Sequence, residues 1–153
     1  MLKRLIPKTK YKFKLYCTYV FLFAFIVNAY AAEEMPLTMK LTPCPNSPNC
    51  VSSQSKSAFS QISPLSYKMS EIQAIDKIKK IMLEMPRTTL IKETDQYLHI
   101  EYRTAILKFV DDVEIIINDT EKVIHLRSAS RLGFWDIGAN KRRINGIKKK
   151  FRE

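Results

Sequence analysis

The chain has 153 residues, 46% of them hydrophobic and 10% aromatic, which is enough for one domain with a buried core and excludes a disordered chain. Its formal net charge is +11, but six of the 26 Lys and Arg lie within the first 14 residues, among no acids. Without residues 1–31, 26 minus 6 leaves 20 basic against 15 acidic residues, or +5. Nucleic acid is therefore not expected as a partner.

The N-terminus has the three parts of a secretory signal peptide. After the basic segment comes an apolar stretch, Leu15–Val27, followed by the Ala-x-Ala step Ala29–Ala31. The stretch is shorter than the roughly 20 residues that span a bilayer. We expect cleavage after Ala31, a short linker at 32–40 and a single domain at 41–153, exported to the periplasm or envelope. An uncleaved N-terminal anchor is the alternative, and it exports the same domain.

Two cysteines remain in the mature chain, because Cys17 leaves with the signal. In an oxidising compartment, Cys44 and Cys50 favour a disulfide over free thiols or a metal site. No metal is predicted, since His99 and His125 are the only histidines and no ligand spacing of the CxxC or HExxH kind is present.

The segment Glu33–Ser70 carries five prolines and no regular hydrophobic period, which predicts an irregular arm. A helix follows, with Ser70 and Gln73 as a capping box and Pro86 beyond its end. Its apolar residues recur at helical spacing: Ile72, Ile75, Ile78, Ile81 and Met82.

Four extended segments come next, Thr88–Lys92, Tyr97–Ala105, Phe109–Ile117 and Val123–Ser130. In the second, Leu98, Ile100 and Tyr102 alternate with polar residues, as in a half-buried strand. The turn-like Asn118-Asp119-Thr120 predicts a hairpin between the last two segments.

A last helix, from about Asn140 to Phe151, carries Ile144, Ile147 and Phe151 on one stripe. The element order predicts a two-layer α+β domain. We expect an antiparallel sheet of about four strands with two helices on one face, the other face open, preceded by a disulfide-tied irregular arm.

Common catalytic signatures such as GxSxG, the P-loop and GxGxxG are absent, so an enzyme is not favoured and no cofactor is expected. A hydrolase with a non-standard site stays open as a third hypothesis. Its residues would be Ser128, Ser130, His125, Asp111 and Asp112.

Basic and polar residues crowd the stretch His125–Arg143. In an extended strand Arg127 and Arg131 share one face while Ser128 and Ser130 share the other. The first turn of the last helix is basic as well, although the helix dipole there favours anions. A carboxylate, phosphate or anionic head group would be held by Arg127, Ser128, Ser130, Arg131, Asn140, Arg142 and Arg143.

The same arginines have candidate partners inside the protein. A structural network would pair them with Glu101, Asp111, Asp112, Glu114 and Asp136. Phe134 and Trp135 are expected to fill the gap between sheet and helix, the alternative being a hydrophobic lip to a ligand site. Lys148–Lys150 are expected to form a solvated helix end, the alternative being contact with acidic lipid.

Several blocks resemble the bacterial family catalogued as domain of unknown function 1499, over about residues 41–151. The similar blocks are Pro43–Gln54, Ile62–Leu65, Tyr97–Glu101, Phe109–Glu114, Arg127–Arg131 and Asp136–Ile144. The resemblance implies an envelope location, since members are often attached to or sent across membranes. It implies no catalytic residues, because the family's function is unassigned.

Two function hypotheses precede the hydrolase. The first is a non-enzymatic envelope domain that binds a small anion or an envelope protein through Arg127, Arg131, Arg142 and the open sheet face. The second is a structural or interaction domain whose polar residues satisfy one another in a single shared cluster.

Overall fold

The computed structural model describes residues 40–153, so the expected signal peptide at 1–31 and linker residues 32–39 lie outside the described residues. The chain forms two short strands, β1 (Cys50–Ser52) and β2 (Leu65–Ser66), and then helix α2 (Glu71–Leu83). Four longer strands follow: β3 (Thr88–Thr94), β4 (Tyr97–Arg103), β5 (Val110–Asn118) and β6 (Val123–Ser130). Helix α3 (Ala139–Arg152) is the last element.

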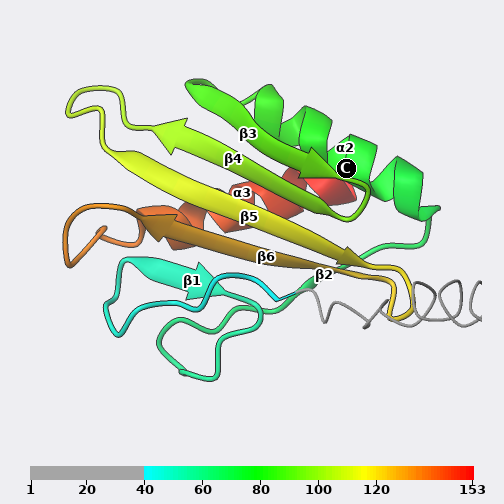
Figure 1. The fold of residues 1–153 in the computed structure, drawn as a ribbon, viewed down its shortest axis with the longest axis horizontal. Coiled ribbons are helices and arrows are strands. Elements are labelled where there is room, and N and C mark those ends of the chain that lie inside the picture. Colours follow the sequence, from blue (N-terminus) through cyan, green and yellow to red (C-terminus); the bar gives the residue numbers. More distant parts are fainter. Residues whose placement is uncertain (1–39) are drawn as a thin grey trace, which may run out of the picture. The chain divides into compact units, whose positions relative to one another are not determined.

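One antiparallel sheet holds all six strands in the order β1-β6-β5-β4-β3, with β2 also paired to β6 (Figure 1). The four expected strands pair in chain order, as their short links predicted. The two additional strands come from the arm, which adds β1 and β2 to the outer edge of β6. They are too short for their alternation to be recognised in the sequence.

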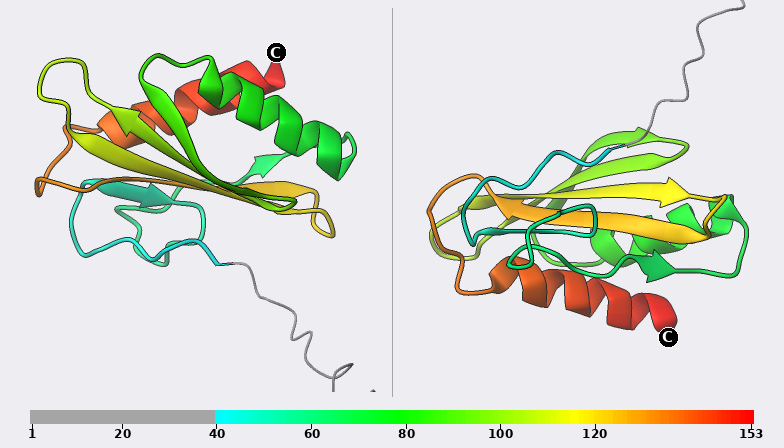
Figure 2. Two further views of the ribbon diagram at one scale, coloured as in Figure 1. Left: turned by 45° about the horizontal axis from the view of Figure 1, so that its top comes forward. Right: turned by 90° about the horizontal axis from the view of Figure 1, so that it is seen from below.

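Both helices lie on one face of this sheet, which confirms the α+β fold (Figure 2). Helix α2 begins with the expected capping box: Ser70 accepts the Gln73 N–H, and the Gln73 side chain accepts the Ser70 N–H. Its buried residues include Ile75 and Ile78, but Ile72 is 73% exposed. Ile72 was wrongly placed on the buried stripe, because α2 packs against α3 and β3 along a narrow face.

The core lies between the sheet and the helices. Its fully buried side chains include Leu98, Ile100, Ile115, Ile124, Leu126, Ile144 and Ile147. They come from alternate positions of β4, β5 and β6 and from the predicted stripe of α3. Lys148 departs from the expected solvated helix end: it is buried and donates to the Ser63 carbonyl, whereas Lys149 and Lys150 are exposed.

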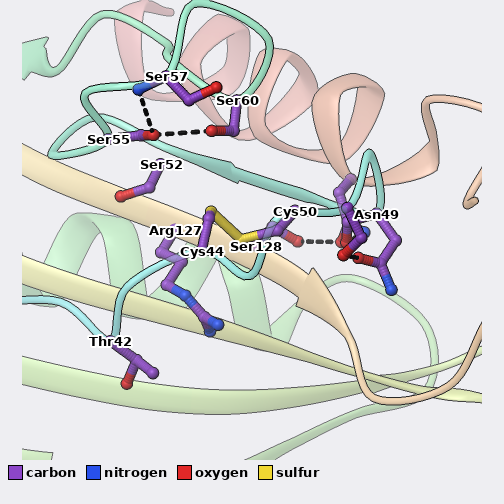
Figure 3. The surroundings of a disulfide bond; sticks show 12 residues. Thr42, Cys44, Asn49, Cys50, Ser52, Ser55, Ser57, Ser60, Arg127 and Ser128 are labelled. Carbon is purple, nitrogen blue, oxygen red and sulfur yellow. Dashed lines mark hydrogen bonds between the residues drawn. A yellow bond between two sulfur atoms is a disulfide. The ribbon is translucent and has the colours of Figure 1, made fainter. Parts of the chain in front are cut away.

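The arm is tied down by the expected disulfide between Cys44 and Cys50, whose Cα atoms are 5.6 Å apart. The bridge lies at the β1–β6 pair, where Cys50 is opposite Ala129 (Figure 3). It closes the loop that leads into the sheet's edge strand.

Candidate functional site

The sheet separates the predicted site residues into two groups. Because side chains alternate along β6, Arg127 points away from the helices, as does Arg131 just beyond the strand, while Ser128 and Ser130 face α3. This alternation was expected. The expectation of a single shared cluster is wrong, because the sheet itself lies between the two sets of side chains.

The first group is buried under the start of α3, and we call it the inner network: Asp111, Ser128, Ser130, Asn140 and Arg143. The Arg143 guanidinium donates to Asp111 Oδ2 at 2.5 Å, to Ser128 Oγ at 2.8 Å and to Asn140 Oδ1 at 2.7 Å. Asn140, fully buried, accepts from Ser128 and donates to Ser130 Oγ at 3.0 Å. Four of the five residues are buried and Ser130 is half-buried, so most of the network is shielded from solvent.

Two further residues join the inner network without having been predicted. The Asn49 carbonyl accepts from the Asn140 amide at 2.8 Å, and the Asn49 side chain donates to the Gly133 carbonyl. The Tyr102 ring lies 4.2 Å from the Arg143 guanidinium carbon, a cation–π contact. Tyr102 was assigned to the apolar face of its strand, which is the face that Arg143 meets.

The second group lies on the opposite face and includes a buried ion pair. Arg127 Nη1 donates to Glu114 Oε2 at 2.8 Å, and both side chains are 9% exposed. Glu114 also accepts from Tyr97 at 3.0 Å and from Thr42 of the arm at 2.8 Å. Burial, with the negative charge of Glu114 beside it, raises the pKa of the Tyr97 hydroxyl. The arm thus covers part of the face that was expected to be open.

Arg131 is the centre of a more exposed cluster on the same face. Its guanidinium binds Asp112 through two hydrogen bonds of 2.8 Å and Glu101 through one of 2.5 Å. His99 Nε2 lies 2.7 Å from the same Asp112 carboxylate. The hydrogen bonds from Arg131, and then that with His99, hold the pKa of Asp112 below its ordinary value of 3.8.

The N-terminus of α3 already has its anion. Asp136 accepts the backbone N–H of Gly138 at 2.8 Å and of Asn140 at 2.7 Å, so its carboxylate caps the helix and does not pair with an arginine. Arg142 donates to the Ile137 carbonyl at 2.7 Å. Among the described residues no carboxylate pairs with Arg142, unlike Arg127, Arg131 and Arg143.

The residues considered for a hydrolase fall on both faces of the sheet. Ser128, Ser130 and Asp111 belong to the inner network, whereas His125 and Asp112 lie on the other face. The His125 Nδ1 atom is 3.1 Å from the hydroxyl of Ser53, and burial lowers the His125 pKa below 6.5. Within residues 40–153, no cluster of three or more His, Cys, Asp or Glu suited to a metal ion is present.

Six large apolar side chains are exposed at one end of the sheet, and we call this surface the apolar loop end. They come from loops 104–109 and 131–138 and are between 64% and 88% exposed: Ile106, Leu107, Leu132, Phe134, Trp135 and Ile137. The loops are neighbours, since the Arg131 N–H donates to the Val110 carbonyl at 3.0 Å (Figure 1). The expectation that Phe134 and Trp135 fill the core is therefore wrong, because α3 seals this edge with polar residues.

Both loops contain a non-glycine residue with left-handed backbone. Lys108 has φ of 56° and Ile137 has φ of 53°. For a β-branched residue such as Ile137 this conformation is costly, of order 1–3 kcal/mol. Core packing does not compensate for this cost, because the Ile137 side chain is 71% exposed.

A small open cavity of about 320 Å³ lies beside the apolar loop end, at the first turn of α3. Its lining includes Thr104 and Ala105 of the first loop together with Arg142 and Arg143. Apolar side chains and the guanidinium groups that we expected to bind an anion both line this cavity.

A family model described as "Protein of unknown function (DUF1499)" matches residues 40–151. No curated protein matches the chain. In residues 40–153, neither helix has the length and apolar character needed to cross a membrane.

Proposed function

Since the chain belongs to the DUF1499 family of proteins of unknown function, we propose that it is an exported envelope domain without enzymatic activity that binds its partner through the apolar loop end. One observation carries this proposal: six large apolar residues on two neighbouring loops are each at least 64% exposed. Large exposed apolar side chains gathered at one end of a domain commonly mark an interaction site.

The arginines at the centre of the sequence-based hypothesis have a different role in this proposal. Arg127, Arg131 and Arg143 each bind carboxylates of the same domain. A guanidinium already paired in this way loses those bonds if it is to bind an external anion. Their contacts therefore support a fold-holding role, although the buried Nε atoms of Arg127 and Arg143 have no hydrogen-bond partner among the described residues.

Two observations, one from the sequence and one from the structure, support export. The N-terminal basic segment, apolar stretch and Ala-x-Ala step fit a secretion signal. The Cys44–Cys50 bridge fits an oxidising compartment such as the periplasm.

Site-specific photo-crosslinking in living cells tests the proposal. Benzoylphenylalanine in place of Phe134, which is 73% exposed, should give adducts in the envelope fraction. The matched control is the same probe in place of Phe59, which is 96% exposed but lies on the arm between β1 and β2. No adduct from position 134, or equal yields from both positions, would contradict the proposed binding surface.

A second candidate function is binding of a small anion in the cavity beside Arg142. It is favoured by the exposed guanidinium, which pairs with no carboxylate of residues 40–153. Phosphate added to the full chain should then shift the Arg142 side-chain NMR signal in a saturable way. In the Arg142→Gln variant, the phosphate-induced shifts of the other residues that line the cavity should no longer saturate. A linear, unsaturable response of the unmodified chain would refute this function.

A further inference from the structure

The partner of the apolar loop end follows from its chemistry. Resting on the proposed function, we propose that this surface inserts into the interface of a lipid bilayer with anionic head groups. The occupant is the membrane surface itself, with Trp135 and Ile106 among the acyl chains and the neighbouring cations at the phosphates.

The apolar part of the surface fits a membrane interface. Trp is enriched where head groups meet acyl chains, and aliphatic side chains add apolar area that enters the bilayer. Trp135, Ile106 and Leu107 are 70%, 88% and 67% exposed, so most of that area is free in solution. Asp136 is the one acidic residue in loops 104–109 and 131–138. Both of its carboxylate oxygens accept backbone N–H groups at the start of α3.

The charge beside the apolar side chains selects anionic lipid. Lys108 lies within the first loop, and Lys141 and Arg142 lie in the first turn of α3; all three are exposed. Within residues 40–153, none of the three forms an ion pair. Uncompensated cations on the first loop and on the helix turn that follows the second loop complement phosphodiester head groups, since each basic side chain near such a surface adds to binding.

The position of the loops makes insertion geometrically simple. Both leave the same end of the sheet, where Arg103 is opposite Val110 and Asp111 is opposite Ser130. Both loops therefore project from one end of the sheet (Figures 1 and 2), and Thr104 and Ala105 at the base of the first loop line the cavity at the first turn of α3. A flat bilayer can receive both tips at once, whereas a protein partner would need a matching recess.

Fluorescence of the full chain tests the proposal directly. The sequence has one tryptophan, so emission reports Trp135 whatever the N-terminal segment does. Vesicles of equimolar phosphatidylglycerol and phosphatidylcholine should shift the emission to shorter wavelength. Brominated acyl chains in the same vesicles should quench it. Phosphatidylcholine alone should give a weaker response.

Matched variants separate insertion from general stickiness. Ile106→Ser should raise the anionic lipid concentration for half-maximal shift about ten-fold, from the apolar area lost. Ile72→Ser is the control, because Ile72 is 73% exposed but lies next to Glu71, which binds Gln96 at the other end of the sheet. The double variant Lys108→Ser, Lys141→Ser should raise that concentration by about five-fold for each lysine removed.

Two results overturn the inference: no shift or quenching with anionic vesicles, or equal responses to anionic and neutral vesicles. Equal effects of Ile106→Ser and Ile72→Ser would overturn it as well. If vesicles fail while benzoylphenylalanine at position 134 still gives envelope adducts, the partner is a protein, and the proposed function survives without this inference. If both fail, the apolar loop end has no binding role.

Discussion

Replacing Arg143 by Met tests whether the inner network holds the fold. The guanidinium is 7% exposed and bonded to Asp111, which is 4% exposed, and to Ser128 and Asn140. After Arg143→Met, Ser128 still donates to Asn140. Asp111, in contrast, loses the one side-chain partner found for it among the described residues. The main effect of the substitution is therefore an unpaired buried carboxylate.

The expected destabilisation follows from that carboxylate. Removing one partner of a buried ion pair costs about 3–5 kcal/mol. The total stability of a domain is of order 5–15 kcal/mol, so the variant should lose about a fifth of it or more. For a domain of this size, roughly 3–6 °C is lost per kcal/mol, which predicts a melting temperature lower by about 9–30 °C.

Urea and thermal unfolding should be followed by far-UV circular dichroism, because the single tryptophan, Trp135, is 70% exposed and reports the core poorly. The decisive comparison is the double variant Asp111→Leu, Arg143→Met, which removes both charges. It should be more stable than Arg143→Met alone. If Arg143→Met costs less than about 1 kcal/mol, or if the double variant loses the sum of both single losses, the network is not what stabilises this edge.

Three further changes should have measurable outcomes. Burial lowers the pKa of His125 in the folded protein. The free energy of unfolding is therefore highest above the unfolded pKa of 6.5 and declines as the pH falls below 6.5. His125→Gln should therefore flatten the decrease in melting temperature between about pH 7 and about pH 5. The depressed pKa of Asp112 stabilises the fold at pH values above 3.8, and this stabilisation is lost as the pH falls through the folded pKa. Arg131→Ala should therefore destabilise the protein at about pH 7 and much less at about pH 2. Since Arg131 is 44% exposed, that loss at neutral pH should stay near about 1 kcal/mol. Ile137→Gly relieves a left-handed β-branched residue and should add about 0.5–1 kcal/mol in urea unfolding, while weakening vesicle binding.

Local patterns in the sequence were sufficient for most of the fold. The alternation of Leu98 and Ile100 with polar neighbours gave β4, and Ser70 with Gln73 gave the start of α2. Such signals are readable because each residue's side of the strand or helix depends only on its near neighbours. The same alternation on β6 correctly put Arg127 and Ser128 on opposite faces.

Contacts between residues far apart in the sequence could not be predicted from such local patterns. The two short strands of the arm are specified by their pairing with β6 and not by their own pattern. Asn49 entered the inner network through contacts with Asn140, 91 residues away. Trp135 was assigned to the core because large aromatic residues usually bury area, and no local feature of a Gly-rich loop reveals that the core is already closed.

The inner network and the apolar loop end are physically connected. Asn49 bonds both Asn140 and the Gly133 carbonyl, and Arg143 bonds Asp111 at the start of β5, next to loop 104–109. These bonds fix the bases of both loops to the sheet, so their tips need no apolar packing of their own. Loops that display large apolar side chains in water would otherwise fold back to bury them. A buried polar network is thus suited to this edge, because hydrogen bonds hold the loops in place while leaving Trp135 exposed.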